Sequence, residues 1–171
     1  ARRQRQMCIR DRYIRMIELK TAVLMAGAAH IGALIGGADD DSCRKLYRFA
    51  NELGLAFQLQ DDLLDSYGTE EQLGKAIGGD ILEGKKTFLM ISALEHLNEE
   101  DRHELQSLHL STALIPQQKI ERARQLFDKS DVRTLTERRI SLHFDRALAA
   151  LDSLEVDKER TELMREFAES L

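Results

Sequence analysis

Proline is nearly absent from this sequence, since Pro116 is the only one in 171 residues. Aromatic residues make up 5% of the chain, and runs of β-branched or aromatic residues, which favour strands, are few. The long proline-free segments are instead rich in Ala, Leu, Glu, Arg and Lys, which are good helix formers. We therefore predict an all-α fold, and the length allows one domain with a sizeable core.

Cysteine is also scarce, with only Cys8 and Cys43. Two cysteines without a spacing pattern provide neither a disulfide framework nor a zinc site, so a reducing cytoplasm is the expected location. The net charge of −5 gives no reason to expect nucleic-acid binding. The composition thus gives no support for a nucleic-acid partner.

Positive charge is concentrated in residues 1–12, ARRQRQMCIRDR, which hold five arginines and one aspartate. A basic arm of this kind could bind nucleic acid or a membrane. However, MCIRDR resembles translated adapter sequence at the broken end of a reading frame. We favour this second interpretation and expect residues 1–12 to be a non-native arm or sequencing scar. Residues 13–171 would then form one helical domain whose native N-terminal part is missing.

Charged residues are absent from residues 21–38, TAVLMAGAAHIGALIGGA. This run just reaches the length that spans a membrane, but Ala and Gly dominate it and His30 lies in its middle. We therefore expect no membrane span here. The pattern favours a buried helix that packs closely through its small residues.

Turn and capping signals predict a series of consecutive helices. The first is expected over residues 13–36 and the second, long helix from Asp39–Ser42 to about Tyr67. Residues 68–84 contain half of the ten glycines and form the main predicted loop. Further helices are expected at residues 85–97, 99–110, from Pro116 onward, at 131–154 and at 157–171.

Three aspartates, Asp61, Asp62 and Asp65, interrupt the apolar run FQLQDDLLD. On a helical wheel they share one sector with Gln58, while Leu and Phe cover most of the remaining circumference. Three carboxylates on a mostly buried helix repel one another, so we expect raised pKa values, a basic partner or bound divalent cations. Oxygen-only ligands favour Mg²⁺, which in turn predicts a phosphorylated substrate. A helix N-cap or a solvated acidic face is the structural alternative.

Basic residues that suit a phosphorylated substrate occur in two other segments. Lys20 and Thr21 lie in ELKTA, where the first helix changes from charged to apolar. Lys75, Asp80 and Lys85 lie in the glycine-rich loop, which could act as a lid over a diphosphate. A lysine that reaches an exposed edge along its own stem, and a plain solvated loop, are the alternatives.

Three segments, YIRMIELKTA, GLAFQLQDDLLD and GKAIGGDILEGKKTF, occur in an order and at a spacing that point to one family. Together they resemble the C-terminal half of the trans-type isoprenyl diphosphate synthases, the family of farnesyl and geranylgeranyl diphosphate synthases. The resemblance is strong over residues 13–97 and weaker beyond them. It implies an isoprenoid-synthase-type helical bundle around an apolar cavity, truncated here to its C-terminal helices, and a homodimer at full length.

The resemblance also implies a function. It is that of a Mg²⁺-dependent transferase that condenses an allylic prenyl diphosphate with isopentenyl diphosphate to make a longer prenyl diphosphate. Asp61, Asp62 and Asp65 would form the family's second aspartate-rich motif, which binds Mg²⁺. The allylic diphosphate would be contacted by Lys20, Thr21, Gln58, Lys75 and Lys85, supported by Asp80, with Lys20, Asp61 and Lys75 taking part in catalysis.

The sequence departs from the family pattern because it lacks the first aspartate-rich motif that a full member carries upstream. We therefore expect this polypeptide to be inactive alone and an added N-terminal half to restore turnover. A non-catalytic subunit of a heteromeric prenyl diphosphate synthase is the alternative, although such subunits usually lose aspartates that this chain keeps. A di-iron bundle needs two E-x-x-H motifs, and only Glu100–His103 has that pattern.

Overall fold

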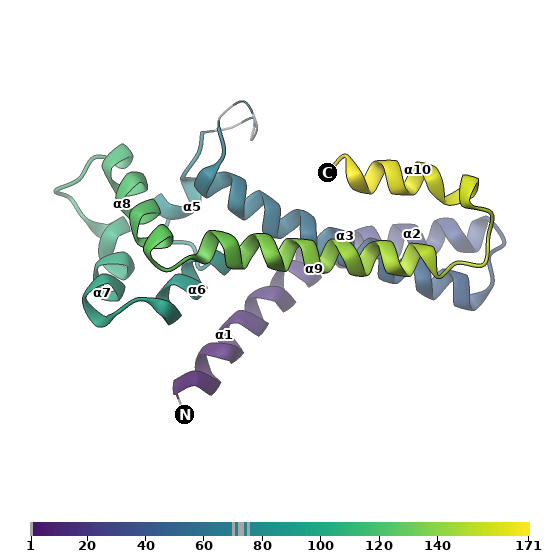
Figure 1. The fold of residues 1–171 in the computed structure, drawn as a ribbon, viewed down its shortest axis with the longest axis horizontal. Coiled ribbons are helices and arrows are strands. Elements are labelled where there is room, and N and C mark those ends of the chain that lie inside the picture. Colours follow the sequence, from purple (N-terminus) through teal and green to yellow (C-terminus); the bar gives the residue numbers. More distant parts are fainter. Residues whose placement is uncertain (1, 70, 72–73, 75) are drawn as a thin grey trace. The chain divides into compact units, whose positions relative to one another are not determined.

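The computed structural model describes residues 2–69, 71, 74 and 76–171. Every regular element within these residues is a helix (Figure 1), which confirms the all-α prediction. The elements are, in chain order, α1 (Arg2–Ile17), the π-helix η1 (Glu18–Ala22), α2 (Val23–Ile35), α3 (Asp40–Tyr67), α5 (Gly79–Leu82), α6 (Phe88–His96), α7 (Glu99–Ser107), the 3₁₀-helix η2 (Leu108–Leu110), α8 (Pro116–Lys129), α9 (Val132–Asp152) and α10 (Lys158–Glu169).

Local capping explains where several of these helices begin. The Asp39 carboxylate accepts the N–H of Ser42 at 2.7 Å, which confirms the predicted start of α3. At the start of α7, the Asn98 side chain accepts the N–H of Asp101 at 2.9 Å. Pro116 is the first residue of α8, a position whose N–H takes no part in the hydrogen bonds within the helix, so a proline fits there without cost. The sequence signals for helix starts are therefore reliable in these segments.

The chain divides into two compact units whose boundaries lie inside helices. Unit 1 comprises Ala1–Ile14 and Leu59–Arg138, and unit 2 comprises Arg15–Gln58 and Arg139–Leu171. The chain passes from one unit to the other within α1, α3 and α9 rather than in a linker. For this reason the composition of the sequence gives no sign of the division.

The core of unit 1 is formed largely by α6, α7 and α8. Leu89, Leu105 and Phe127 are at most 1% exposed and belong to one apolar cluster. Burying a side chain of this size stabilises the fold by roughly 1.5–3 kcal/mol. Ile81 of the short helix α5 belongs to the same cluster. The segment that follows the glycine-rich loop is thereby anchored to the interior of unit 1.

Unit 2 has its own core, to which α2, α3, α9 and α10 contribute. Its members include Phe49, Leu53 and Leu151, each at most 4% exposed. Gly54 permits an especially close approach, because a Cβ on this residue would lie 2.7 Å from the Cα of Ala22. The backbones of η1 and α3 are therefore in direct contact at this point.

The prediction of a buried helix over residues 21–38 is wrong for the large side chains of α2. Small residues such as Ala26 and Ala33 are buried, but Leu24 is 72% exposed and Ile35 is 83% exposed. The helical repeat explains this outcome, because the small and the bulky residues lie on opposite faces of the helix. Small residues therefore make the close contacts, as expected, while the bulky aliphatic face has no cover within unit 2.

Within the part of the chain that the structure describes, one helix, running from Ile9 to Ile35, is long and apolar enough to cross a membrane by length and composition. In its most apolar stretch, 22% of the residues are buried inside the chain. Core helices of water-soluble proteins also meet these criteria, so the pattern alone is weak support for a membrane span.

Candidate functional site

The acidic segment of α3 lies in unit 1, near the end of the helix. Asp62 and Asp65 are 3% and 4% exposed, and Asp61 is half-buried. This burial excludes a solvated acidic face, and an N-cap is excluded because the 28-residue helix begins at Asp40. Buried carboxylates need hydrogen bonds or opposite charges, so the partners of these side chains determine what the site can do.

Asp62 has a different partner at each carboxylate oxygen. Its Oδ2 accepts the hydroxyl hydrogen of Tyr13, and its Oδ1 accepts a hydrogen bond from Lys85 Nζ at 3.4 Å. Burial raises the pKa of Asp62 to about 6, because it outweighs the opposite effects of Tyr13 and Lys85. Burial and the charge of Asp62 also raise the pKa of Tyr13, so the tyrosine hydroxyl stays protonated and remains the donor.

Lys85 connects the aspartate-rich segment to the segment after the glycine-rich loop. Its Nζ donates to both carboxylate oxygens of Asp80, at 2.9 and 2.8 Å, in addition to Asp62. Partial burial lowers the pKa of Lys85, but the hydrogen bond to Asp80 and the charges of Asp62 and Asp80 raise it overall. A basic partner and a raised carboxyl pKa, two of the predicted ways to relieve the crowded negative charge, are both present.

Asp65 fixes the backbone of the glycine-rich segment. Its Oδ2 accepts the N–H of Asp80 at 3.0 Å, and its backbone carbonyl accepts the N–H of Gly78 at 2.7 Å. Gly78 has a φ of 81°, and a Cβ on this residue would lie 2.4 Å from Cδ1 of Ile120. Only glycine fits this position without strain. These contacts hold Asp80 where its carboxylate can bind Lys85.

Tyr13, Asp62, Asp65, Asp80 and Lys85 thus form one hydrogen-bonded cluster. Its carboxylate oxygens suit Mg²⁺, but several of them already accept hydrogen bonds from protein groups. Among residues 2–69, 71, 74 and 76–171, no group of three acidic, histidine or cysteine side chains is placed so that it could hold a metal ion. A carboxylate offers about four lone-pair sites, so one hydrogen bond per oxygen does not exclude a cation. Joint binding of a cation by Asp61, Asp62 and Asp65 stays a prediction.

The other predicted site residues lie elsewhere in the chain. Lys20, Thr21 and Gln58 belong to unit 2, and Lys75 lies outside the described residues. Lys20 is exposed and Thr21 is half-buried, and both lie in η1. Short π-helical turns of this kind occur frequently at functional sites. The structure therefore brings together the acidic segment, Asp80 and Lys85, whereas the roles of these four residues stay predictions.

Tyr13 belongs to the cluster although the sequence pattern assigned it no role. It is 6% exposed and lies 49 residues before Asp62 in the chain. Viewed on its own helix, Tyr13 is an aromatic residue at an apolar position. The only available signal was the general need of a buried carboxylate for hydrogen-bond donors. That need indicates the kind of partner but not which residue supplies it.

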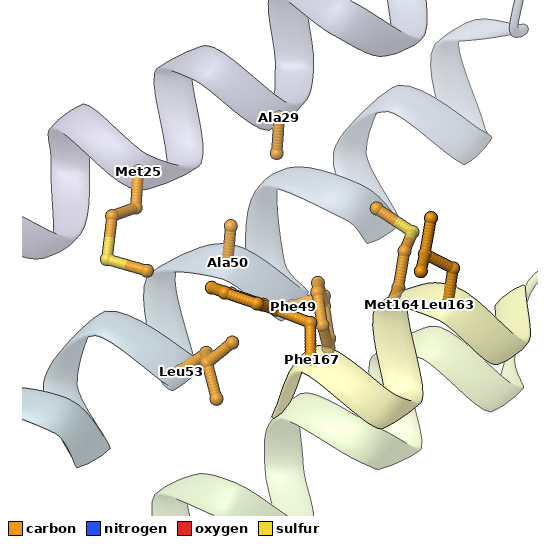
Figure 2. Close-up of a pocket in the computed structure, with 8 residues that line it drawn as sticks. All are labelled: Met25, Ala29, Phe49, Ala50, Leu53, Leu163, Met164 and Phe167. Carbon is orange, nitrogen blue, oxygen red and sulfur yellow. The ribbon is translucent and has the colours of Figure 1, made fainter. Parts of the chain in front are cut away.

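Unit 2 contains an apolar pocket with a volume of about 570 Å³ (Figure 2). Met25 and Ala29 of α2, Phe49 and Leu53 of α3, and Phe167 of α10 contribute to its lining. Figure 2 shows that the labelled side chains come from these three helices and carry no nitrogen or oxygen. A lining of this kind suits a hydrocarbon group and offers no side-chain hydrogen bonds to a polar one.

Family comparison agrees with the motifs that form the cluster. A profile of the family described as polyprenyl synthetase matches residues 1–127. This chain belongs to the polyprenyl synthetase family. The match includes all three segments that carried the resemblance, from the Lys20 region through the aspartates to Lys85. The predicted family is therefore confirmed.

Curated relatives of this polyprenyl synthetase chain have names from the same family. A short chain isoprenyl diphosphate synthase of Methanothermobacter thermautotrophicus is 44% identical over 98 residues, which cover 57% of this chain and 30% of that protein. Heptaprenyl diphosphate synthase component 2 of Bacillus subtilis is 32% identical over 151 residues, which cover 88% of this chain and 42% of that protein. The chain thus spans less than half the length of these relatives.

Solved structures of polyprenyl synthetases share the fold. The polyprenyl synthetase of Streptomyces coelicolor A3(2) has a TM-score of 0.84 at 26% identity, with 94% of this chain and 49% of that chain covered. Geranylgeranyl pyrophosphate synthase of Corynebacterium glutamicum, solved with isoprenyl diphosphate and magnesium, has a TM-score of 0.78 at 30% identity, with 87% and 42% covered. The isoprenoid-synthase-type helical fold is therefore confirmed.

Proposed function

We propose that this chain supplies the second aspartate-rich motif of an enzyme that condenses an allylic prenyl diphosphate with isopentenyl diphosphate. The observation that carries the proposal is the cluster in which Lys85 joins Asp62 to Asp80. Its members come from two of the family's motifs, and the packing of unit 1 brings them together across 23 residues of sequence. Membership of the polyprenyl synthetase family supports the same class of reaction.

The chemical requirement of this reaction is stabilisation of a departing diphosphate. The C–O bond of the allylic substrate breaks, and the diphosphate leaves with the electron pair. The double bond of isopentenyl diphosphate then attacks the allylic cation and a carbon–carbon bond forms. The resulting cation loses a proton to the released diphosphate, and a new double bond forms. Lys85 would bind the departing oxygens by exchanging one of its hydrogen bonds, since its three N–H groups donate to Asp62 and Asp80. We assign further diphosphate contacts to Lys20, Thr21, Gln58 and Lys75.

Asp61, Asp62 and Asp65 are the residues that would hold Mg²⁺. When bound, Mg²⁺ neutralises phosphate charge and acts as a Lewis acid toward the leaving group. The all-oxygen donor set of these residues, of which Asp62 and Asp65 are buried, supports this assignment. So does the relative from Corynebacterium glutamicum, which was solved with magnesium and isoprenyl diphosphate.

The chain alone is proposed to lack turnover, because its 171 residues contain one aspartate-rich motif of the DDxxD type. In the complete enzyme we propose a homodimer. A second candidate function is that of one subunit of a heteromeric prenyl diphosphate synthase. The similarity to a protein named heptaprenyl diphosphate synthase component 2, which covers 88% of this chain, favours that candidate.

A reconstitution assay tests the proposal. The chain is incubated with labelled isopentenyl diphosphate, geranyl diphosphate and MgCl₂, with and without the separately produced N-terminal half of a relative. We expect a labelled prenyl product only from the mixture, and we expect Asp61→Ala in this chain to abolish it. Product formed equally well with the Asp61→Ala chain would contradict the role of the motif. Product formed by this chain alone would contradict the proposed division of the active site.

A further inference from the structure

The hydrogen bond from Tyr13 reaches the aspartate-rich segment from a different helix. Tyr13 lies in α1, is buried, and donates its hydroxyl hydrogen to Asp62 Oδ2 within unit 1. One turn earlier in α1, Arg10 forms an ion pair with Glu95 of α6 at 3.0 Å, and the Glu95 side chain is 10% exposed. Because Arg10 belongs to residues 1–12, the expected non-native arm, the role of Tyr13 rests on its own burial and its hydrogen bond to Asp62.

The two carboxylate oxygens of Asp62 accept hydrogen bonds from different groups, and these groups constrain the carboxylate to different extents. Lys85 contacts Oδ1 at 3.4 Å while making shorter hydrogen bonds to both oxygens of Asp80. The lysine is thus directed mainly at Asp80 and cannot by itself fix the rotation of the Asp62 carboxylate. Tyr13 supplies the missing constraint at Oδ2. A hydrogen bond to a metal-ligating carboxylate from a group that does not itself bind the metal fixes the orientation of that carboxylate toward the metal ion.

We propose that Tyr13 is a positioning residue, which holds Asp62 Oδ2 so that Oδ1 faces Lys85 and the cation bound by the aspartate-rich motif. This inference rests on the proposed function, because it assumes that the motif binds Mg²⁺. It assigns Tyr13 a role that is separate from core packing. Removing the hydroxyl should therefore change the free energy of Mg²⁺ binding by more than it changes the free energy of unfolding.

Tyr67 provides a matched control within the same unit. Its hydroxyl also donates to an aspartate, Asp128, at 2.8 Å, and its ring lies 5.2 Å from the guanidinium carbon of Arg133. Tyr67→Phe removes the same kind of hydrogen bond and keeps the ring. Tyr13→Phe and Tyr67→Phe thus differ in whether the lost hydrogen bond serves Asp62.

The test is calorimetric titration of the full 171-residue chain and both variants with MgCl₂, after circular dichroism and urea unfolding have shown that each is folded. We expect Tyr13→Phe to weaken Mg²⁺ binding about 10- to 100-fold, the usual effect of losing a hydrogen-bond partner of a metal ligand. We expect Tyr67→Phe to leave the affinity unchanged. Equal affinities for all three chains would overturn the inference alone. Absence of Mg²⁺ binding by the folded, unsubstituted chain would overturn the proposed half-site and this inference with it.

A second measurement covers the case in which Tyr13→Phe does not fold. The chain has three tyrosines, at positions 13, 47 and 67, so 3-fluorotyrosine labelling gives three ¹⁹F signals. Tyr47→Phe and Tyr67→Phe assign them by elimination without any change at Tyr13. We expect Mg²⁺ to shift the Tyr13 signal and to leave the Tyr67 signal in place. An unmoved Tyr13 signal in a chain that binds Mg²⁺ would overturn the inference.

Discussion

The contact between η1 and α3 at Gly54 allows a quantitative test of the packing in unit 2. A Cβ on residue 54 would lie 2.7 Å from the Cα of Ala22, 2.9 Å from its Cβ and 3.2 Å from Sδ of Met25. The two contacts to Ala22 are about 1 Å shorter than the optimal separation of carbon atoms. Because one of them is to the backbone, no side-chain rotation can relieve it. Gly54→Ala must therefore move η1 away from α3.

The expected stability change combines a gain with a larger loss. Replacing Gly by Ala in a helix interior stabilises by about 0.5–1 kcal/mol. Inserting a methyl group into a closely packed core typically costs about 1–3 kcal/mol, and the backbone contact places Gly54 toward the upper end. We expect Gly54→Ala to lower the free energy of unfolding by roughly 1–2 kcal/mol. Gly27 of α2 is the control, because a Cβ on it would meet nothing within 4 Å.

Urea unfolding followed by circular dichroism at 25 °C measures both variants. Gly27→Ala receives the helix-propensity gain without a clash, so it should raise the free energy of unfolding by about 0.5–1 kcal/mol. The difference between the two variants is the informative quantity, because the propensity gain is common to both. If Gly54→Ala were as stable as Gly27→Ala, the close approach of Ala22 and Gly54 would be refuted.

Two further predictions concern other buried positions. His143 Nδ1 lies 2.7 Å from Glu52 Oε2 in unit 2, and although burial raises the pKa of Glu52, the hydrogen bond and charge of His143 lower it overall. A carboxyl group whose pKa is lowered on folding stabilises the fold above its ordinary pKa of 4.5, and this contribution is lost as the pH falls below 4.5. Glu52→Gln should therefore be less stable than the unsubstituted chain at pH 7, and the difference, measured by urea unfolding, should shrink between pH 4.5 and pH 3. A difference that stays constant from pH 7 to pH 3 would contradict the pairing. Gly78→Ala should cost more free energy of unfolding than Gly37→Ala, because both positions have positive φ values, of 81° and 76°, but a Cβ would collide with Ile120 only at Gly78. Equal losses in thermal unfolding would show that the Ile120 contact is absent.

Local sequence signals correctly predicted helix boundaries where a capping residue, a glycine or a proline marks the start or the end of the helix. Asp39 and the Tyr67–Gly68 pair marked both ends of α3, and Pro116 marked the start of α8. These features depend on neighbouring residues, which a sequence displays directly. The acidic sector of α3 was also predictable, because helical geometry alone places Asp61 and Asp65 one turn apart.

Contacts between distant segments could not be predicted in the same way. The bond from Tyr13 to Asp62 joins residues 49 positions apart, and no periodicity in either helix indicates it. The exposure of Leu24 was missed because hydrophobicity shows which residues favour burial but not whether a partner covers them. The contact of Asp65 with the backbone of Asp80 depends on the path of a glycine-rich loop. Such paths are set by tertiary packing.

The central claim is that the aspartate-rich motif of this chain forms a Mg²⁺-dependent diphosphate site. Calorimetric titration of the 171-residue chain with a non-hydrolysable allylic diphosphate analogue, with and without Mg²⁺, tests it most directly, beside the Asp61→Ala and Asp65→Ala variants. The account predicts binding that requires Mg²⁺ and disappears in the Asp61→Ala variant. Absence of binding by a folded chain, or equal binding by the wild-type and Asp61→Ala chains, would contradict it.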